Sequence, residues 1–298
     1  MKKHYVRNNV KYIFVNFKYY LTFYFGAISF IGVIIAIASC IINVSDLLNE
    51  WSIAQKIGLI VGVYFGIAFL IIPFFFWKRR LIYYKNGEHE VSAEYGDLNK
   101  LSYKYGSEKV VFINVNTTFD MIIEPPGPKA LVAEGTNHGR FIKRVCDANK
   151  LTFEQLNSDV QKLLDNQTKF TPRTVKREKG NEKDYPIGTY VIYKLGKISY
   201  LLFAFARFNE NNNAYPGEES KDELPLKELL TAVNESSQNL DVYIPLLGTG
   251  NSRYHFSNYD SFNQIKHYLL SHKRNIEAKY RIVVYSGIKD EVSIFKNT

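Results

Sequence analysis

The sequence predicts an α/β protein in two parts, a hairpin of two transmembrane helices and a three-layer α/β/α cytoplasmic domain with a mixed sheet. Residues 19–44 and 57–77 contain no Asp, Glu, Lys or Arg. From about residue 88 onward, short apolar runs alternate with segments of helical periodicity, as in a sheet covered by helices. The net charge of +9 is uneven, because residues 1–80 hold nine Lys and Arg against two Asp and Glu.

Each uncharged stretch is long enough, as a helix, to cross a hydrocarbon core about 30 Å thick. We therefore expect spans at 19–44 and 57–77, in preference to buried core helices or a cleaved signal peptide. Basic residues flank both outer ends, while the connector between the spans carries two acidic residues. The positive-inside rule then places both termini in the cytoplasm, with a basic segment at 1–18 and a linker at 78–87.

The predicted spans carry no ionisable side chain, which argues against a proton relay or a charge-lined transport path. Gly58, Gly62 and Gly66 recur every four residues in the second span. This spacing suits a homo-oligomer interface or packing within the hairpin, although glycine is also common in membrane helices generally. A constitutive two-span channel subunit is a minor alternative, because few polar residues are available to line its pore.

Residues 88–298 are predicted to form one domain in which strands and helices alternate. Residues 171–184 are polar and charged, which predicts an exposed loop. Thr152 is a good N-cap for the helix that follows Leu151. Strands are expected at 90–98, 109–115, 185–208 (two strands around a turn at 195–197), 241–247, 280–286 and 292–296, with further helices near Pro225 and at 259–272.

Neither a metal site nor a nucleic-acid site is expected. The six histidines and two cysteines show none of the spacings typical of zinc ligands, and two cysteines cannot build a disulfide framework. The basic residues Arg173, Lys176, Arg177 and Lys179 share their loop with acidic residues, so a solvated loop explains them better than a nucleic-acid surface.

In sheets of this kind ligands bind beyond the carboxyl ends of the strands, so loops that directly follow strands are the candidate site. Three such loops combine glycine with amide, hydroxyl and charged side chains, and their backbone N–H groups could hold phosphate oxygens. Each loop alone also fits an ordinary strand-ending turn. The candidate residues are Asn116, Thr117, Thr118, Phe119 and Asp120; Glu134, Asn137, His138, Gly139 and Arg140; and Leu247, Gly248, Thr249, Gly250, Asn251, Ser252 and Arg253.

Taken together, these segments resemble the macro domain, an ADP-ribose-binding module. Gly96-Asp97-Leu98 resembles its Gly-Asp-hydrophobic segment, whose Asp contacts adenine, so the resemblance adds Asp97 to the candidate residues. Residues 186–189 resemble the strand entry of that fold, and residues 244–250 resemble its phosphate loop. The closer resemblance is to the macro-domain (type II) form of the Thoeris anti-phage effector family ThsA. It covers essentially the whole chain and rests on residues 115–120, 137–141 and 248–253.

This resemblance implies a macro-like nucleotide-binding domain at 88–298 with no resident cofactor. It also implies a TIR-domain partner that converts NAD into a diffusible signal, histidine-linked ADP-ribose. Binding of this signal would assemble the spans into a homo-oligomer that contacts lipid and breaches the bacterial inner membrane, which leads to abortive infection.

A membrane-tethered ADP-ribosyl hydrolase is the main alternative, because several macro domains cleave ADP-ribose conjugates. Such an enzyme needs a positioned acid, base or nucleophile, and Asp120, Glu134 and His138 are available in the loops. The chain lacks a segment like the Gly-Gly-Gly and paired Glu of the poly-ADP-ribose hydrolases. We therefore expect a receptor without catalytic residues rather than an enzyme.

Overall fold

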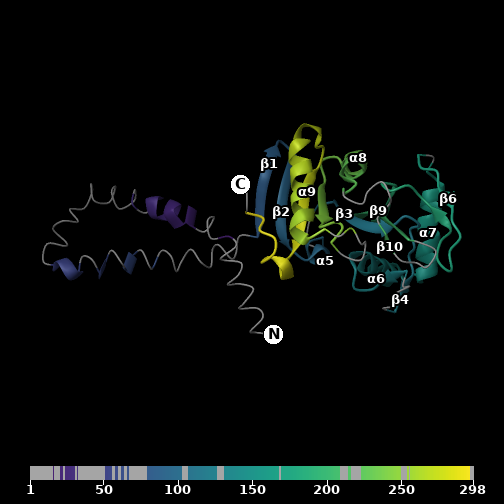
Figure 1. Cartoon of the computed structure of the whole chain (residues 1–298), viewed down its shortest axis with the longest axis horizontal. Helices are drawn as coiled ribbons and strands as arrows, with labels where there is room; N and C mark the ends of the chain where they lie inside the picture. The colour runs from purple at the N-terminus through teal and green to yellow at the C-terminus, as the bar shows by residue number, and fades with distance from the viewer. Residues whose placement is uncertain are drawn as a thin grey trace. The chain divides into compact units, whose positions relative to one another are not determined.

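Figure 1 shows the computed structural model of the chain. The structure describes residue 16, 21–22, 24–30, 32, 51–55, 58–59, 62–63, 66, 79–102, 107–125, 131–167, 169–208, 214–215, 223–249, 254 and 256–295. The chain divides into two compact units, residues 1–81 with 293–298, and residues 82–292. The candidate site residues all belong to the second unit.

A mixed sheet of eight strands forms the framework of the second unit. Its order is β1-β2-β12-β11-β3-β9-β10, with β8 also paired to β9. The strands β2, β12, β11, β3 and β9 run parallel, whereas β8 and β10 run antiparallel to β9. The bounds are β1 Arg80–Asn86, β2 His89–Gly96, β3 Lys109–Asn116, β8 Tyr190–Leu195, β9 Ile198–Phe208, β10 Ala214–Tyr215, β11 Asp241–Pro245 and β12 Lys279–Tyr285.

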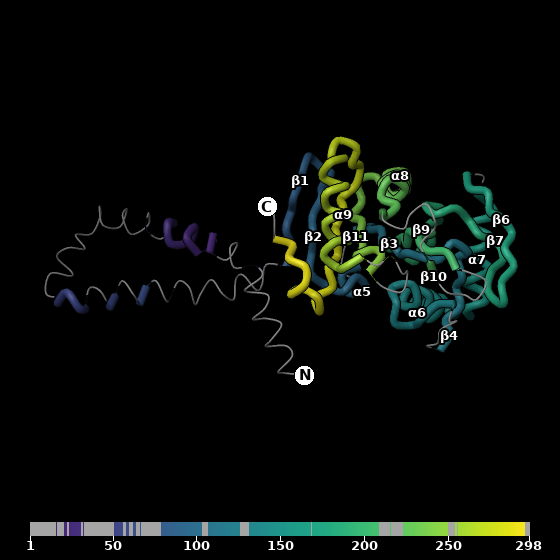
Figure 2. The backbone as a smooth tube through the Cα atoms, viewed as in Figure 1, coloured from purple at the N-terminus to yellow at the C-terminus, as the bar shows by residue number. Residues whose placement is uncertain are grey.

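Helices cover both faces of this sheet (Figure 2). α6 and α7 pack on the side of β3 and β8, whereas α8 and α9 contact one another and α9 lies against β2 and β12. Two short two-stranded sheets complete the unit. The bounds are α5 Leu98–Leu101, α6 Asn137–Asn149, α7 Phe153–Asp165, α8 Leu226–Ser236, α9 Asn258–Ser271, β4 Ile123–Glu124, β5 Val132–Ala133, β6 Arg173–Thr174 and β7 Lys183–Asp184, with single turns η2 Lys273–Asn275 and η3 Ser286–Ile288.

The alternation of side chains along β3 explains why helices are needed on both faces. Val111, Ile113 and Val115 belong to the apolar core cluster that contains the buried side chains of α6 and α7. Val110 and Phe112 lie outside that cluster and are fully buried as well. Because neighbouring strand residues point to opposite faces, β3 is covered on both sides, as its continuous apolar run predicts.

Several predicted elements are present and others differ. The strand at 109–115, the paired strands around Gly196 and the helix capped by Thr152 are found. The elements that were not predicted include α6, which begins inside a presumed loop, and β1, which lies within residues 78–87. The predicted strand at 292–296 is wrong, because none of its described residues, 292–295, belongs to a strand.

The predicted transmembrane hairpin is not supported. Among the described residues, no helix has both the length and the apolar character needed to cross a membrane. Most of 19–44 and 57–77 lies outside the described residues. This finding overturns the hairpin and the inner-membrane location that depended on it. Among the described residues, none comes within 4 Å of a Cβ placed at Gly58, Gly62 or Gly66.

Candidate functional site

The carboxyl ends of five parallel strands lie at one edge of the sheet, and three of the predicted segments follow strands that end there. Asp97 follows β2, the Leu247 loop follows β11, and Asn116 ends β3. The register places Tyr285, at the end of β12, beside Gly96, and Asn116 beside Ala206 of β9. Segments more than a hundred residues apart in sequence therefore contribute to the same edge, where α/β sheets bind ligands.

Asp97 caps the short helix α5 and also contacts α6. One of its carboxylate oxygens, Oδ1, accepts a hydrogen bond from the Asn99 N–H at 2.9 Å. The other, Oδ2, lies 3.5 Å from Nη1 of Arg140 in the first turn of α6. Both side chains are partly exposed, so this ion pair adds little stability and leaves the carboxylate accessible. The structure thus brings two predicted residues together.

The N-terminus of α6 lies very close to the backbone at the end of β5. Thr136 Oγ1 accepts a hydrogen bond from the Gly139 N–H at 3.0 Å and donates one to the Ala133 carbonyl at 2.7 Å. A Cβ on Gly139 would lie 2.3 Å from the Ala133 oxygen, so this position requires glycine. The N–H groups of Asn137 and His138 lie in the first turn, where no helical carbonyl can accept them and where an anion is favoured.

His138 and Glu134, two of the candidate acid–base residues, lie in opposite environments. His138 is buried, with Nε2 3.4 Å from the sulfur of Met121, and burial lowers the pKa of its imidazole to about 3. This side chain is therefore neutral at physiological pH. Glu134 is exposed and forms an ion pair with Lys143, which holds the pKa of the Glu134 carboxyl below its usual range.

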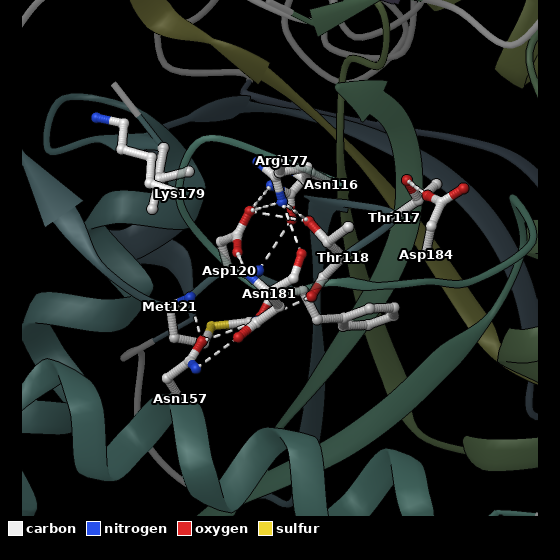
Figure 3. A network of polar contacts seen from close by, with 12 residues as sticks. Asn116, Thr117, Thr118, Asp120, Met121, Asn157, Arg177, Lys179, Asn181 and Asp184 are labelled. Carbon is white, nitrogen blue, oxygen red and sulfur yellow. Dashed lines mark hydrogen bonds and ion pairs between the residues drawn. The ribbon is translucent and has the colours of Figure 1, made fainter. Parts of the chain in front are cut away.

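The loop after β3 forms a buried polar network (Figure 3). Asp120 Oδ2 accepts hydrogen bonds from Asn116 Nδ2 at 2.6 Å and from Thr118 Oγ1 at 2.8 Å. The Asn116 amide oxygen in turn accepts the Asp120 N–H at 2.9 Å. All three side chains are buried, so their polar atoms are used within the protein.

Two residues that the sequence analysis assigned to a solvated loop complete this network. Arg177 Nη1 lies 2.9 Å from Asp120 Oδ2, and both side chains are 2% exposed. The Asn181 N–H donates to Asp120 Oδ1 at 2.7 Å, and its side chain exchanges hydrogen bonds with Asn157 of α7. The prediction that residues 171–184 are simply exposed is therefore wrong for Arg177, which is buried by its contacts in the folded domain.

The other two predicted residues of this loop are also buried. Thr117 donates its hydroxyl hydrogen to Asp184, which is also bound by Arg173 Nε at 2.7 Å. Phe119 adopts a left-handed φ of 51° and packs its ring edge-on against Tyr185, with the centroids 5.8 Å apart. Side chains from Asn116 to Asp120 therefore hold the loop in place and present little to solvent.

The described part of the loop after β11 is tied to α9 and turns at Gly248. The Leu247 N–H donates to Ser261 Oγ of α9 at 2.9 Å, and Gly248 has a φ of 74°. A Cβ on Gly248 would lie 3.0 Å from side-chain carbons of Tyr254 and Phe256. Thr249 follows, half-buried. Gly250, Asn251, Ser252 and Arg253 lie outside the described residues.

Tyr285 is a further candidate residue that the sequence analysis did not name. The residue is 57% exposed at the end of β12, directly beside Gly96 and therefore next to Asp97. An exposed aromatic ring can stack on a nucleobase. Among the described residues, no group of His, Cys, Asp or Glu side chains has the arrangement of a metal site.

A family model described as "Thoeris protein ThsA, Macro domain" matches residues 91–285 of the chain. The matched range begins in β2 and ends with Tyr285, so it includes all four segments of the candidate site. A search among curated proteins gives no match.

Proposed function

The chain belongs to the macro-domain family of the Thoeris protein ThsA, and from this premise we propose that it is the receptor of a Thoeris anti-phage defence system. In this proposal the macro-like domain binds an ADP-ribose-derived signal at the carboxyl edge of its sheet. The signal is histidine-linked ADP-ribose, produced from NAD by a TIR-domain partner. No resident cofactor takes part.

The observation that carries this proposal is the meeting of three kinds of group at one edge. Tyr285 offers an exposed ring, and Asp97 beside it offers a carboxylate that can accept from an exocyclic amino group. The first turn of α6 offers unpaired N–H groups, and the loop at Gly248 approaches from β11. In ADP-ribose the base would contact the ring and the carboxylate, and the pyrophosphate would contact the N–H groups and the Gly248 loop.

Binding without cleavage fits the site better than hydrolysis, because each candidate acid or base is already engaged. Asp120 is ion-paired with Arg177 and buried. His138 is neutral and faces the Met121 sulfur, and Glu134 is paired with Lys143 at the surface. A general acid or base must lie within hydrogen-bond reach of the reacting group, and the burial of Asp120 and His138 keeps both side chains from a ligand at the surface.

Membrane disruption is not part of this function, because it requires membrane-spanning helices and none is found among the described residues. We propose that ligand binding changes the state of the macro-like domain. A ligand shifts the equilibrium between two conformational states of a protein according to the difference between its affinities for them. The size of that difference therefore sets how far the population of the two states changes.

Calorimetry on the purified full-length chain tests the proposal. We expect histidine-linked ADP-ribose to bind more tightly than ADP-ribose, and NAD to bind weakly. Ligand recovered after binding should have an unchanged mass. Recovery of free histidine and ADP-ribose would favour the hydrolase instead, and absence of binding to all three compounds would contradict both functions.

A further inference from the structure

Residues 286–292, here called the C-terminal turn, directly follow the exposed Tyr285 at the end of β12. The turn begins with the single helical turn η3. The Ile288 carbonyl then accepts the N–H groups of Glu291 at 2.9 Å and of Val292 at 3.1 Å. The backbone of the turn therefore closes on itself immediately beyond the tyrosine.

Two side-chain contacts join the C-terminal turn to the rest of the domain. The phenol of Tyr95, in β2, donates to the Val292 carbonyl at 2.8 Å, and both residues are buried. The Asn258 amide, at the start of α9, donates to Glu291 Oε2 at 2.7 Å. The turn is therefore tied to α9 and to β2, the strand that leads directly to Asp97.

Gly287 is the residue of the C-terminal turn against which the Tyr285 ring lies. A Cβ on Gly287 would be 2.5 Å from Cε1, 3.0 Å from Cδ1 and 3.4 Å from Cζ of that ring. Nonbonded carbon atoms approach one another to about 3.5 Å, so the ring cannot keep this place when residue 287 carries a side chain. Tyr285 is nevertheless 57% exposed, so part of its side chain rests on the turn and part is open to solvent.

The cross-strand neighbour of Tyr285 also lacks a side chain. This neighbour is Gly96 of β2, where an added Cβ would lie 2.5 Å from Cδ1 of Leu101. Side chains at paired positions of a sheet normally pack against one another. The Tyr285 ring cannot pack in this way, so its contact with Gly287 becomes more important for its orientation.

This contact matters because an exposed tyrosine otherwise rotates freely. A side chain at the end of a strand exchanges among staggered rotamers, and only some of them present the ring to a ligand. Binding then has to immobilise the side chain, and the loss of rotamer freedom opposes association. A ring that already rests in one rotamer binds without this cost.

We propose that Gly287 is a positioning residue for Tyr285. Its lack of a side chain lets the aromatic ring lie on the C-terminal turn, which holds the ring in one orientation before the ligand arrives. The inference rests on the proposed function, in which this ring contacts the ligand. It adds a residue that affects ligand binding through Tyr285.

Calorimetry with ADP-ribose on the full-length chain tests this role. Gly287→Ala should weaken binding by about threefold to tenfold, the range expected when one side chain has to be immobilised. The midpoint of thermal unfolding without ligand should not fall, because an exposed ring can rotate into solvent at little cost. Ser286→Ala places alanine at the preceding exposed position of the same turn and should change neither quantity.

A double-mutant cycle shows whether Gly287 acts through the ring. Tyr285→Ala should weaken ADP-ribose binding, and adding Gly287→Ala to that variant should cause no further loss. If Gly287→Ala does lower the unfolding midpoint, the cycle still decides, because a general loss of folding would reduce affinity with or without the ring.

Three results would overturn the inference. They are wild-type affinity in Gly287→Ala, an equal loss from Gly287→Ala in the presence and in the absence of the Tyr285 ring, and wild-type affinity in Tyr285→Ala. Wild-type protein that binds no ADP-ribose would instead contradict the proposed function itself.

Discussion

Gly248 is the residue at which backbone conformation and close contact coincide. Its φ of 74° costs a side-chain-bearing residue about 1–2 kcal/mol, and a Cβ there would also press on Tyr254 and Phe256. Gly248→Ala should therefore lower both the free energy of unfolding and the affinity for ADP-ribose. Thermal unfolding and calorimetry measure the two effects.

Gly196, in the turn between β8 and β9, provides the matched control. Its φ is 58°, and an added Cβ would meet nothing within 4 Å. Gly196→Ala should lower the free energy of unfolding only by the cost of placing alanine at a positive φ, and it should leave ligand binding unchanged. Equal effects of the two substitutions on binding would show that the Gly248 loop does not contact the ligand.

His138 makes the stability of the domain depend on pH. Burial lowers the pKa of its imidazole to about 3, whereas the unfolded chain has the ordinary value of about 6.5. Below pH 6.5 the unfolded state binds a proton that the folded state does not, so stability is complete above that pH and falls as pH decreases toward 3. The loss is about 1.4 kcal/mol per pH unit.

A comparison of wild type with His138→Leu isolates this contribution. Chemical unfolding at a series of pH values from 7 to 4 should show a steeper loss of stability for wild type than for the variant. Parallel curves would mean that the histidine is charged or solvated in the folded protein.

At the level of single elements, two helices with the same kind of cap separate stability from binding. Thr136 caps α6 at the candidate site, and Thr152 caps α7 with a full capping box. Replacing either threonine with alanine should lower the free energy of unfolding by about 1 kcal/mol. We expect Thr136→Ala alone to weaken ADP-ribose binding, because it loosens the first turn of α6. Equal binding by both variants would exclude that turn from the ligand site.

The elements that the sequence predicts well are those whose pattern is local. The apolar run around Phe112 identifies β3, and the turn at Gly196 identifies the β8–β9 pair. α6 was missed because its first residues are polar and include Gly139, which is normally a poor helix former. Its apolar residues Phe141 and Val145, four positions apart on one face, were the available signal.

The buried Arg177 could not be predicted from its own segment. Lys176, Glu178 and Lys179 surround it, and such composition is typical of solvated loops. The Arg177 side chain is buried because it forms an ion pair with Asp120, which lies beneath residues 171–184 in the folded domain. A buried carboxylate needs a positively charged partner. The available signal was the position of Asp120, shortly after a strand predicted to be buried on both faces, because a carboxylate there requires a positively charged partner. The partner that fixes the segment from Asn116 to Asp120 was therefore not predicted.

At the level of the whole molecule, ligand binding should raise thermal stability. A ligand that binds the folded state at a concentration 100 times its Kd adds about 2.7 kcal/mol, which raises the midpoint of a domain this size by about 5–10 °C. We expect this shift with ADP-ribose and with its histidine conjugate in thermal scans of the full-length chain. Binding detected by calorimetry without such a shift would place the ligand outside the cooperative unit at 82–292.

The strand order has a consequence for how the protein is made. β12 is the last strand in the sequence, yet it lies between β2 and β11 in the middle of the sheet and brings Tyr285 to the site. While the ribosome still covers β12, the nascent chain has Asp97 and the Gly248 loop but no strand to hold them side by side. We therefore expect prematurely terminated chains that lack β12 not to bind ADP-ribose.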